Sequence, residues 1–319
     1  MGSHEVSKMF PKKFTLFKIV RTTIQFIAFI ILNACILGIC EEFTIPLPIL
    51  YPSTVPTAAF LGGFDVIQYR ISHAIFPFIT LGIFIVIAAT LGRTFCGWIC
   101  PFGLLQDLIS YIGYKKVTVS KRAHNFLKQV KYMVLFLTIL MVGIVGVLTA
   151  QNRGKEFIDA LGYFAYQPFT PFSPSETFFT VIPKIISYIA SNPSQLRVIL
   201  DPMLLINLIE VQEPILIFRI VFLGILLTLM FFIPRFWCRY LCPVGALMAT
   251  FSSEHSLLTI KRNIVRCIEC ETCSKVCPMQ IPVLKVLKEK GKLMDSECIK
   301  CMDCIFACPE NALSIAVVE

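Results

Sequence analysis

The sequence is short of charged residues. Asp, Glu, Lys and Arg make up only 15% of its 319 residues, while 56% are hydrophobic, and a soluble globular domain is usually about a quarter charged. The mean hydropathy is +0.76. This shortage of charge argues against a soluble protein and predicts a chain that lies mostly in a membrane.

Histidine and the common catalytic motifs are also scarce. The four histidines all lie outside the long apolar runs, so no haem ligand is available inside a span. The sequence has no nucleophile–base pair, phosphate-binding loop or HExxH motif, which are the patterns that substrate chemistry often uses. It also lacks a short apolar core with a small-residue cleavage site, so we expect the first apolar run to be retained as a span.

Four long apolar runs predict membrane spans, because a transmembrane helix needs roughly 20 apolar residues. The runs are Thr22–Cys40, Ala74–Gly92, Tyr132–Ala150 and Pro214–Pro234. Arg219 is the one charged residue inside them, and we expect it to reach toward the membrane surface. Two shorter runs, Phe178–Ala190 and Val198–Ile209, favour re-entrant or interfacial helices. With both inserted, the chain would cross six times instead of four, with its ends on the same side.

The basic residues set the orientation of these spans. Of the 29 Lys and Arg residues, 23 lie before the first span, between residues 93 and 131, or after Pro234. Cytoplasmic loops of membrane proteins collect Lys and Arg, so both termini are predicted to be cytoplasmic. This placement accounts for the net charge of +9 without nucleic acid, and it predicts a multi-pass protein of the cytoplasmic membrane, in contact with the lipid bilayer.

Two identical cysteine runs lie near the C-terminus. Each has the spacing C-x2-C-x2-C-x3-C followed by proline, as in bacterial [4Fe–4S] ferredoxins, where the fourth cysteine ligates the other cluster. The predicted ligand sets are Cys267, Cys270, Cys273 and Cys308 for one cluster, and Cys298, Cys301, Cys304 and Cys277 for the other. Zinc also accepts C-x2-C pairs, but eight cysteines in two identical runs make zinc the weaker alternative and a disulfide framework weaker still.

A second cysteine motif follows two of the predicted spans. The segments Arg93–Leu105 and Arg235–Leu247 share the pattern R-x-aromatic-C-x-aromatic-x-C-P-x-G-x-L, which indicates two related halves. Cysteines four residues apart lie on one helical face, and the proline limits further winding. Four thiolates could hold a further [4Fe–4S] cluster at the membrane surface; the candidate ligands are Cys96, Cys100, Cys238 and Cys242. A structural thiol pair, a redox dithiol and another metal are the open alternatives.

These features divide the chain into two parts. Residues 1–247 form a predicted α-helical membrane domain of two related halves, and residues 248–319 form a predicted α+β domain of the bacterial two-[4Fe–4S] ferredoxin type. In the second domain we expect strands at 257–260 and 313–317 and a helix at 281–290. Such a small domain has little hydrophobic core, so its clusters should supply much of its folding energy.

The motifs resemble those of a known family, the NapH-type membrane polyferredoxins that serve periplasmic nitrate reductase. The resemblance rests on the C-x3-C-P motifs at 96–101 and 238–243, on the phrase Cys-Pro-Val-Gly-Ala-Leu at 242–247, and on the paired ferredoxin runs. It implies a quinol dehydrogenase subunit or an electron relay that feeds a partner oxidoreductase. Relatives with the same core include the membrane domain of the nitrous-oxide-reduction regulator and a cytochrome oxidase assembly factor.

The sequence therefore predicts a membrane-bound electron-transfer subunit. Electrons would pass between the quinone pool, or a membrane partner, and the C-terminal clusters, with the C-x3-C-P cysteines as an intermediate station. A redox-linked assembly or regulatory protein is the alternative. His73, beside Tyr69 and Arg70, is a weak candidate for a quinone contact. Arg93 and Arg235 are expected to be positive-inside anchors, or to tune a nearby cluster.

Overall fold

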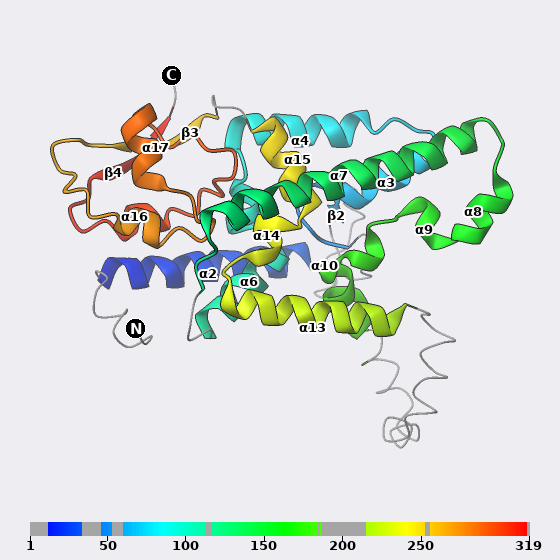
Figure 1. The fold of residues 1–319 in the computed structure, drawn as a ribbon, viewed down its shortest axis with the longest axis horizontal. Helices are drawn as coiled ribbons and strands as arrows, with labels where there is room; N and C mark the ends of the chain where they lie inside the picture. The colour runs from blue at the N-terminus through cyan, green and yellow to red at the C-terminus, as the bar shows by residue number, and fades with distance from the viewer. Residues whose placement is uncertain are drawn as a thin grey trace, which may run out of the picture.

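The structure is a computed structural model that describes residues 12–33, 46–52, 60–112, 117–183, 186, 215–252 and 256–317. The molecule is elongated, with the ferredoxin-like domain at one end and the long apolar helices extending away from it (Figure 1). Two predicted features, the run Val198–Ile209 and the end of the first span at Cys40, lie outside the described residues.

Four helices make up most of the apolar part: α2 (Lys12–Leu32), α4 (Phe78–Leu91), α7 (Lys121–Ala150) and α13 (Leu216–Phe232). Each overlaps one of the four predicted spans. Among the described residues, α2 and α7 are long and apolar enough to cross a membrane, whereas α4 and α13 are apolar but shorter. The structure therefore has a helix at every predicted span, and a helix of spanning length at two of them.

Helix α2 begins earlier than the predicted first span, at Lys12 rather than Thr22. Its first half lies along the ferredoxin-like domain, where the rings of Phe17 and Phe306 stack with their centroids 3.8 Å apart. Arg21, in the middle of the helix, is buried. Hydropathy placed the start of the span directly after Arg21, because a charged residue interrupts an apolar run. In the structure Arg21 lies inside the helix and contacts the second domain.

Shorter elements lie between the long helices. They are α3 (Gly63–Ser72), α8 (Lys155–Leu161), α9 (Tyr163–Tyr166), the 3-10 turn η2 (Thr170–Phe172), α10 (Pro174–Glu176), the π-turn η3 (Thr177–Val181), and the parallel pair β1 (Pro46–Leu47) and β2 (Leu61–Gly62). Helices α3 and α9 pack on α7, while α10 and η3 pack on α13. The described part of the predicted interfacial run Phe178–Ala190 thus includes a π-turn.

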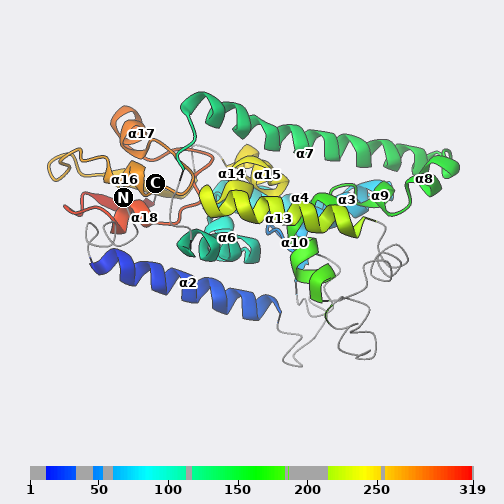
Figure 2. The ribbon, with the colours of Figure 1, turned by 60° about the horizontal axis from the view of Figure 1, so that its bottom comes forward.

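The same order of three helices occurs twice. Helix α4 is followed by α5 (Thr94–Trp98) and α6 (Pro101–Ile112), and α13 is followed by α14 (Phe236–Tyr240) and α15 (Pro243–Phe251). Proline suits the first position of a helix, because its missing N–H has no partner to lose there. Helix α15 packs against α4, and α13 packs against α6 (Figure 2). Each triplet therefore packs its last helix on the first helix of the other triplet.

Arg219 was predicted to reach toward the membrane surface. It lies at the start of α13 and is only 5% exposed. Charged residues in apolar helices commonly face the interior of the bundle.

The C-terminal domain is small and matches its predicted elements. Strand β3 (Leu258–Arg262) pairs antiparallel with β4 (Leu313–Val317), and Ile260 lies opposite Ile315. The helices are α16 (Thr272–Lys275), α17 (Val283–Lys290) and α18 (Asp303–Phe306). Its core includes Ile260, Val283 and Leu287, and Cys96 of α5 belongs to this same cluster of buried residues. The two domains thus share one packed interface.

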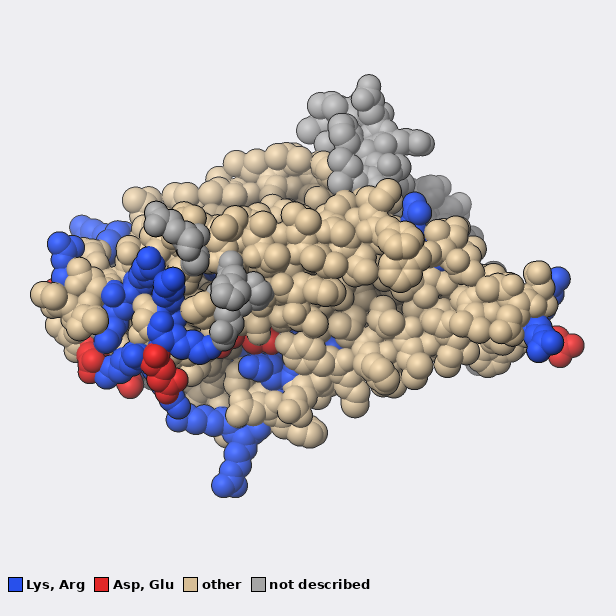
Figure 3. Space-filling model, turned by 90° about the horizontal axis from the view of Figure 1, so that it is seen from above, with Lys and Arg blue, Asp and Glu red and all other residues tan. Residues whose placement is uncertain are grey.

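Charge is distributed unevenly over the surface. Lys and Arg side chains gather at the end formed by the ferredoxin-like domain, while the face over the long helices is almost free of charge (Figure 3). Large apolar side chains are exposed along these helices, among them Phe78, Val86, Phe136 and Ile225. An uncharged apolar belt of this kind suits a lipid environment.

Two glycines of α7 provide a matched test of this packing. A Cβ on Gly146 would lie 2.2 Å from the carbonyl oxygen of Ile71 at the end of α3, whereas a Cβ on Gly143 would have no neighbour within 4 Å. We expect Gly146→Ala to destabilise the fold by about 1–3 kcal/mol, and Gly143→Ala to be neutral or to stabilise by up to about 1 kcal/mol. Thermal unfolding in detergent measures both; equal effects would contradict the close approach of α3 and α7.

Candidate functional site

Two hollows in the ferredoxin-like domain are lined by cysteines. The first, of about 390 Å³ including its mouth, has four: Cys267, Cys270, Cys273 and Cys308. The second, of about 330 Å³, has the other four: Cys277, Cys298, Cys301 and Cys304. Each hollow therefore contains the first three cysteines of one run and the last cysteine of the other run.

The backbone around the two hollows repeats in detail. Glu269 and Glu271 of the first run have φ values of 55° and 59°, and Lys300 and Met302 occupy the same positions of the second run with 49° and 62°. Left-handed residues that alternate with right-handed ones turn successive N–H groups toward one side, which makes an anion-binding concavity common at Fe–S sites. The donor set and the backbone shape of both hollows thus fit a thiolate-ligated iron–sulfur cluster.

No three His, Cys, Asp or Glu side chains of the described residues stand close enough to hold a single metal ion.

The C-x3-C-P cysteines are buried where the two helix triplets meet. Cys96, Cys100, Cys238 and Cys242 are each 4–5% exposed. Helices α5 and α14 end before the second cysteine of each motif, and the proline begins the next helix. The proline thus starts a helix, rather than only limiting the previous one as predicted. The N–H of Gly245 donates to the Cys242 Sγ at 3.4 Å, because Cys242 caps α15.

The arginine of each motif crosses to the other motif. Arg93 donates from Nη2 to the backbone oxygen of Cys238 at 3.0 Å, and Arg235 donates from Nη1 to that of Cys96 at 2.7 Å. Both arginines are completely buried. The prediction that they are surface anchors is therefore wrong, because their guanidinium groups satisfy the backbone oxygens that the short helices α5 and α14 leave unpaired.

The glycine of each motif makes room for this crossing. A Cβ on Gly245 would lie 2.5 Å from the Arg93 Nη2, and a Cβ on Gly103 would lie 2.8 Å from the Cys96 backbone oxygen and 3.6 Å from the Arg235 Nη1. The arginine and glycine of the shared pattern are therefore contact partners between halves. This reciprocal contact explains why they occur together in both copies.

Asp107 neutralises two of the buried arginines. Its carboxylate accepts from Arg235 Nε at 2.8 Å and Nη2 at 2.6 Å, and from Arg21 Nη2 at 2.9 Å. Arg21 continues to Asp303 Oδ1 at 2.9 Å in the second cysteine run. Burial alone would raise the pKa of Asp107, but Arg235 and Arg21 outweigh it and hold that pKa below its usual value. Asp107 therefore stays ionised at neutral pH and joins three parts of the chain.

Glu297 neutralises the remaining motif arginine, Arg93. It accepts from the Arg93 Nη1 at 2.5 Å, from Tyr132 Oη at 2.9 Å, and also from Lys131. Glu297 directly precedes Cys298 in the sequence. Buried ion pairs with full hydrogen bonding are costly to break, at about 3–5 kcal/mol when one partner is removed. The start of the second cysteine run is thus fixed to helix α7 and to the first C-x3-C-P motif.

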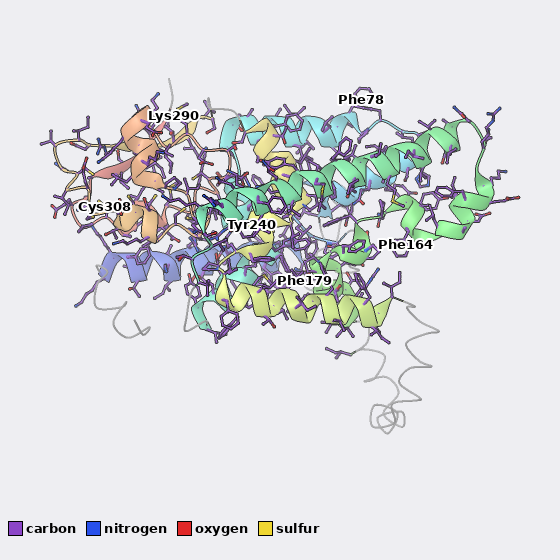
Figure 4. All side chains as sticks on the ribbon, viewed as in Figure 1. Phe78, Phe164, Phe179, Tyr240, Lys290 and Cys308 are labelled. Carbon is purple, nitrogen blue, oxygen red and sulfur yellow. The ribbon has the colours of Figure 1, made fainter. Side chains whose placement is uncertain are left out.

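The loops around the second hollow rest directly on the C-x3-C-P motifs. Trp98 Nε1 donates to the backbone oxygen of Lys300 at 3.0 Å, and a Cβ on Gly97 would lie 2.5 Å from the backbone oxygen of Ile299. On the other motif, Arg239 donates to Gln280 Oε1 at 3.0 Å and to the backbone oxygen of Pro278. Tyr240 marks this junction in Figure 4. The residues between the two cysteines of each C-x3-C-P motif therefore contact residues next to the cysteines of the second hollow.

Cationic side chains outnumber carboxylates in this buried region. Among the described residues here, the buried cations are Arg21, Arg93, Lys131, Arg235, Arg239 and Lys300, and the buried carboxylates are Asp107, Glu297 and Asp303. Buried charges are costly unless they are compensated. The excess of positive charge favours an anionic group next to these residues.

Two of the C-x3-C-P thiols, those of Cys100 and Cys242, are poorly suited to exist as bare thiolates. Burial raises the pKa of the Cys100 thiol to about 12, and repulsion by Cys238 and Cys96 adds to this increase. The pKa of Cys242 is also raised by burial, and by repulsion from the same two cysteines. A thiol of this kind is either neutral or ligates a metal, since a coordinating thiol is deprotonated outright.

A large open hollow of about 1670 Å³ lies between α3 and α4. Its lining combines apolar Val66 and Ile83 with polar Tyr69 and Arg70. His73 is not part of this lining; its ring stacks between Tyr69 and Tyr166, with centroids 4.2 and 4.9 Å away. His73, the residue singled out as a weak quinone contact, therefore packs beside the hollow, whereas its neighbours Tyr69 and Arg70 line it.

Sequence reasoning missed the polar residues that join the motifs. These include Gln106, whose Nε2 donates to the Cys238 Sγ at 2.9 Å, and Gln25, whose Nε2 donates to the backbone oxygen of Gly97 at 2.9 Å. Asp107 and Glu297 were missed as well. A signal was present for Asp107, because it lies four residues after Gly103 and therefore on the same face of α6.

Two family models match the chain. A model described as a 4Fe-4S binding domain matches residues 74–120 and 215–264, which carry the two C-x3-C-P motifs. A model described as a 4Fe-4S dicluster domain matches residues 259–309, which contain all eight cysteines of the ferredoxin runs. No solved structure matches the chain.

Similar proteins occur in an archaeon and in bacteria. An uncharacterised protein of Methanocaldococcus jannaschii is 29% identical over 244 residues, which are 75% of this chain and 70% of that protein. YccM of Escherichia coli, named as an electron transport protein, is 30% identical over 71% of this chain, and the match spans 51% of YccM. The ferredoxin-type protein NapH of Escherichia coli is 29% identical over 25% of this chain and 29% of its own length.

Removing the charge of Asp107 should destabilise the protein more than removing a surface charge. Asp107→Asn leaves Arg21 and Arg235 buried without their shared carboxylate, at an expected cost of about 3–5 kcal/mol. The control is Glu289→Gln, because Glu289 pairs with Lys285 at 3.7 Å on the exposed face of α17, and such surface pairs contribute about 0–1 kcal/mol. Thermal unfolding at neutral pH compares them; equal losses would contradict the joining role of Asp107.

Proposed function

We propose that this chain, which belongs to the family of NapH-type membrane ferredoxins, relays electrons between a membrane donor or acceptor and a partner oxidoreductase. The observation that carries the proposal is that three groups of four cysteines follow one another through the molecule. The first hollow neighbours the second, and the second rests on the C-x3-C-P motifs. Helix α16, which carries Cys273 of the first hollow, packs on α18, which carries Cys304 of the second, and Cys273 packs against the buried cluster that contains Cys301 and Cys304.

The two hollows would hold the two [4Fe–4S] clusters of the dicluster domain. We assign Cys267, Cys270, Cys273 and Cys308 to the first cluster, and Cys298, Cys301, Cys304 and Cys277 to the second. The lining of the hollows and the repeated left-handed residues support this assignment. A bound [4Fe–4S] cluster takes up and releases one electron at a time, and the protein provides the thiolates, the inward N–H groups and the exclusion of water.

Cys96, Cys100, Cys238 and Cys242 would hold a third cluster between the helix triplets. Three observations support this proposal: each of the four thiols is buried, cations exceed carboxylates in this region, and the matching 4Fe-4S binding domain covers both motifs. Gln106 would then adjust the potential of this cluster through its hydrogen bond to the Cys238 sulfur, because hydrogen bonds to cluster sulfurs and nearby charge set such potentials.

In the membrane, we place residues 1–247 as the spanning part and residues 248–319 in the cytoplasm. The uncharged belt of exposed apolar residues and the gathering of Lys and Arg at the ferredoxin end support this orientation, which puts both termini on the cytoplasmic side. Helices α4 and α13 would complete a set of four spans together with α2 and α7.

The hollow between α3 and α4 is our proposed quinone site. Quinones combine an apolar ring with two polar oxygens, and the lining offers apolar Val66 and Ile83 beside Tyr69 and Arg70. Pro46 lies at one edge of this hollow, and Leu50, four residues further, has its backbone oxygen 4.0 Å from the Cys100 Sγ. Four residues span at most about 14 Å, so this edge of the hollow lies near Cys100 of the first C-x3-C-P motif.

Iron content tests the third cluster. We expect the protein purified without oxygen to hold about 12 irons and as many acid-labile sulfides per chain, as three [4Fe–4S] clusters require. Replacing Cys96, Cys100, Cys238 and Cys242 together by Ser should lower both to about 8. If the wild type already holds about 8 and the variant is unchanged, the motifs hold no cluster and a dithiol or structural role replaces it.

Filling the hollow tests the quinone site. Val66→Trp should slow reduction of the clusters by a soluble naphthoquinol about tenfold, since a bulky side chain in a fitted site costs about 1–3 kcal/mol. Val86→Trp is the matched control, because Val86 is exposed on α4 and outside this lining. Stopped-flow absorbance follows the clusters, and dithionite should reduce both variants at the wild-type rate. Equal naphthoquinol rates in the two variants would place the quinone elsewhere.

A further inference from the structure

The two cysteine hollows differ in their access to solvent. Cys270 at the first hollow is exposed, whereas Cys301 and Cys304 at the second are buried. The contacts of the ferredoxin-like domain with Gly97, Trp98 and Arg239 come from the loops of the second hollow. The first hollow is therefore the one that a molecule from solution can approach closely.

Three exposed aliphatic side chains lie in the loop that leads into the first hollow. Ile264, Val265 and Ile268 are 74%, 95% and 63% exposed, and Ile268 also lines the hollow. Isolated exposed aliphatic residues are ordinary, but these three occupy one short loop directly before and within the first cysteine run. Apolar groups gathered at one functional edge indicate a surface that binds a partner.

The loop that carries these residues is held in a fixed shape. Asn263 Oδ1 accepts from the backbone N–H of Val265 at 3.0 Å and from that of Arg266 at 3.4 Å, which is a turn closed by the asparagine side chain. Arg262 and Lys288 both pair with Glu269 behind it. A preordered loop loses little conformational freedom when it binds, so these side chains are well placed for a docking contact.

The position of the loop argues against a lipid partner. The segment between β3 and α16 reaches the end of the molecule that lies farthest from the outer part of α7 (Figure 1). Helix α7 runs along the long axis of the molecule, so this end points away from the apolar belt. Among the residues of the domain that the structure describes, the exposed side chains also include more basic than acidic residues: Lys261, Arg266, Lys275, Lys285, Lys288 and Lys290 against Glu269, Glu271, Glu289 and Glu310.

We propose that the loop Asn263–Cys270 is the docking site for a soluble electron-transfer protein that carries carboxylates around a redox centre near its surface. The partner's apolar patch would cover Ile264, Val265 and Ile268, and its carboxylates would face the basic residues of the domain. One electron then passes between the partner's cofactor and the first cluster, so that one is oxidised as the other is reduced, and no bond is made or broken. This inference rests on the proposed relay and names its partner in solution.

The test uses flavodoxin hydroquinone, a soluble acidic flavoprotein, as the probe. Anaerobic stopped-flow would follow reduction of the clusters in the full chain in detergent. We expect Val265→Asp to lower the second-order rate constant about tenfold, since it removes the burial of one valine from the complex and adds a like charge for the probe. Val265→Ser removes the apolar contact without a charge and should show a smaller loss in the same direction.

Val317→Asp is the matched control. Val317 is 62% exposed at the end of β4 away from the loop, so this substitution adds the same charge at a distance and should leave the rate nearly unchanged. Equal slowing in both Asp variants, or no slowing in either, overturns the docking site. A wild type that dithionite reduces but flavodoxin does not also overturns it. If neither the wild type nor any variant passes electrons to a quinone after reduction by dithionite, the proposed relay itself is contradicted.

Discussion

The arrangement of this protein depends on the neutralisation of two buried arginines. Arg93 and Arg235 have no contact with solvent, and each needs both a carboxylate and backbone oxygens to be stable there. Asp107 and Glu297 supply the carboxylates, and the opposite motif supplies the oxygens. Breaking such a buried pair costs about 3–5 kcal/mol, which is a large part of the stability of a typical domain. The helix triplets and the ferredoxin-like domain are therefore held in one arrangement.

This requirement explains most of the repeated pattern R-x-aromatic-C-x-aromatic-x-C-P-x-G-x-L. The arginine crosses to the other copy, the glycine leaves room for the incoming guanidinium, and the proline begins a new helix directly after the second cysteine. A substitution at any of these positions in one copy affects the other copy. The pattern therefore contains the residues that join the two halves as well as the candidate ligands.

Local features of the sequence were sufficient for the elements, but not for the way they join. The strands, the helix α17 and the cysteine hollows follow from spacing that is visible within a few residues. The partners of Arg93 and Arg21 could not be predicted, because Glu297 and Asp303 lie 204 and 282 positions away. The charge pattern of the sequence also made Arg21 the boundary of a span and Arg93 an anchor. A sequence pattern shows that a residue is charged, but it does not show which carboxylate neutralises that charge.

The three groups of cysteines differ in their contact with water, and this difference bears on the path of electrons in the proposed relay. The first hollow is open beside Cys270, the second is mostly closed, and the C-x3-C-P cysteines are sealed among apolar side chains and paired charges. A buried centre surrounded by fixed charges is shielded from oxidants in solution, and its potential depends on those charges. In the proposed relay, electrons at the C-x3-C-P cysteines would therefore leave by the proposed quinone hollow or by the second cluster, and an exchange with solution would require passage through the first cluster.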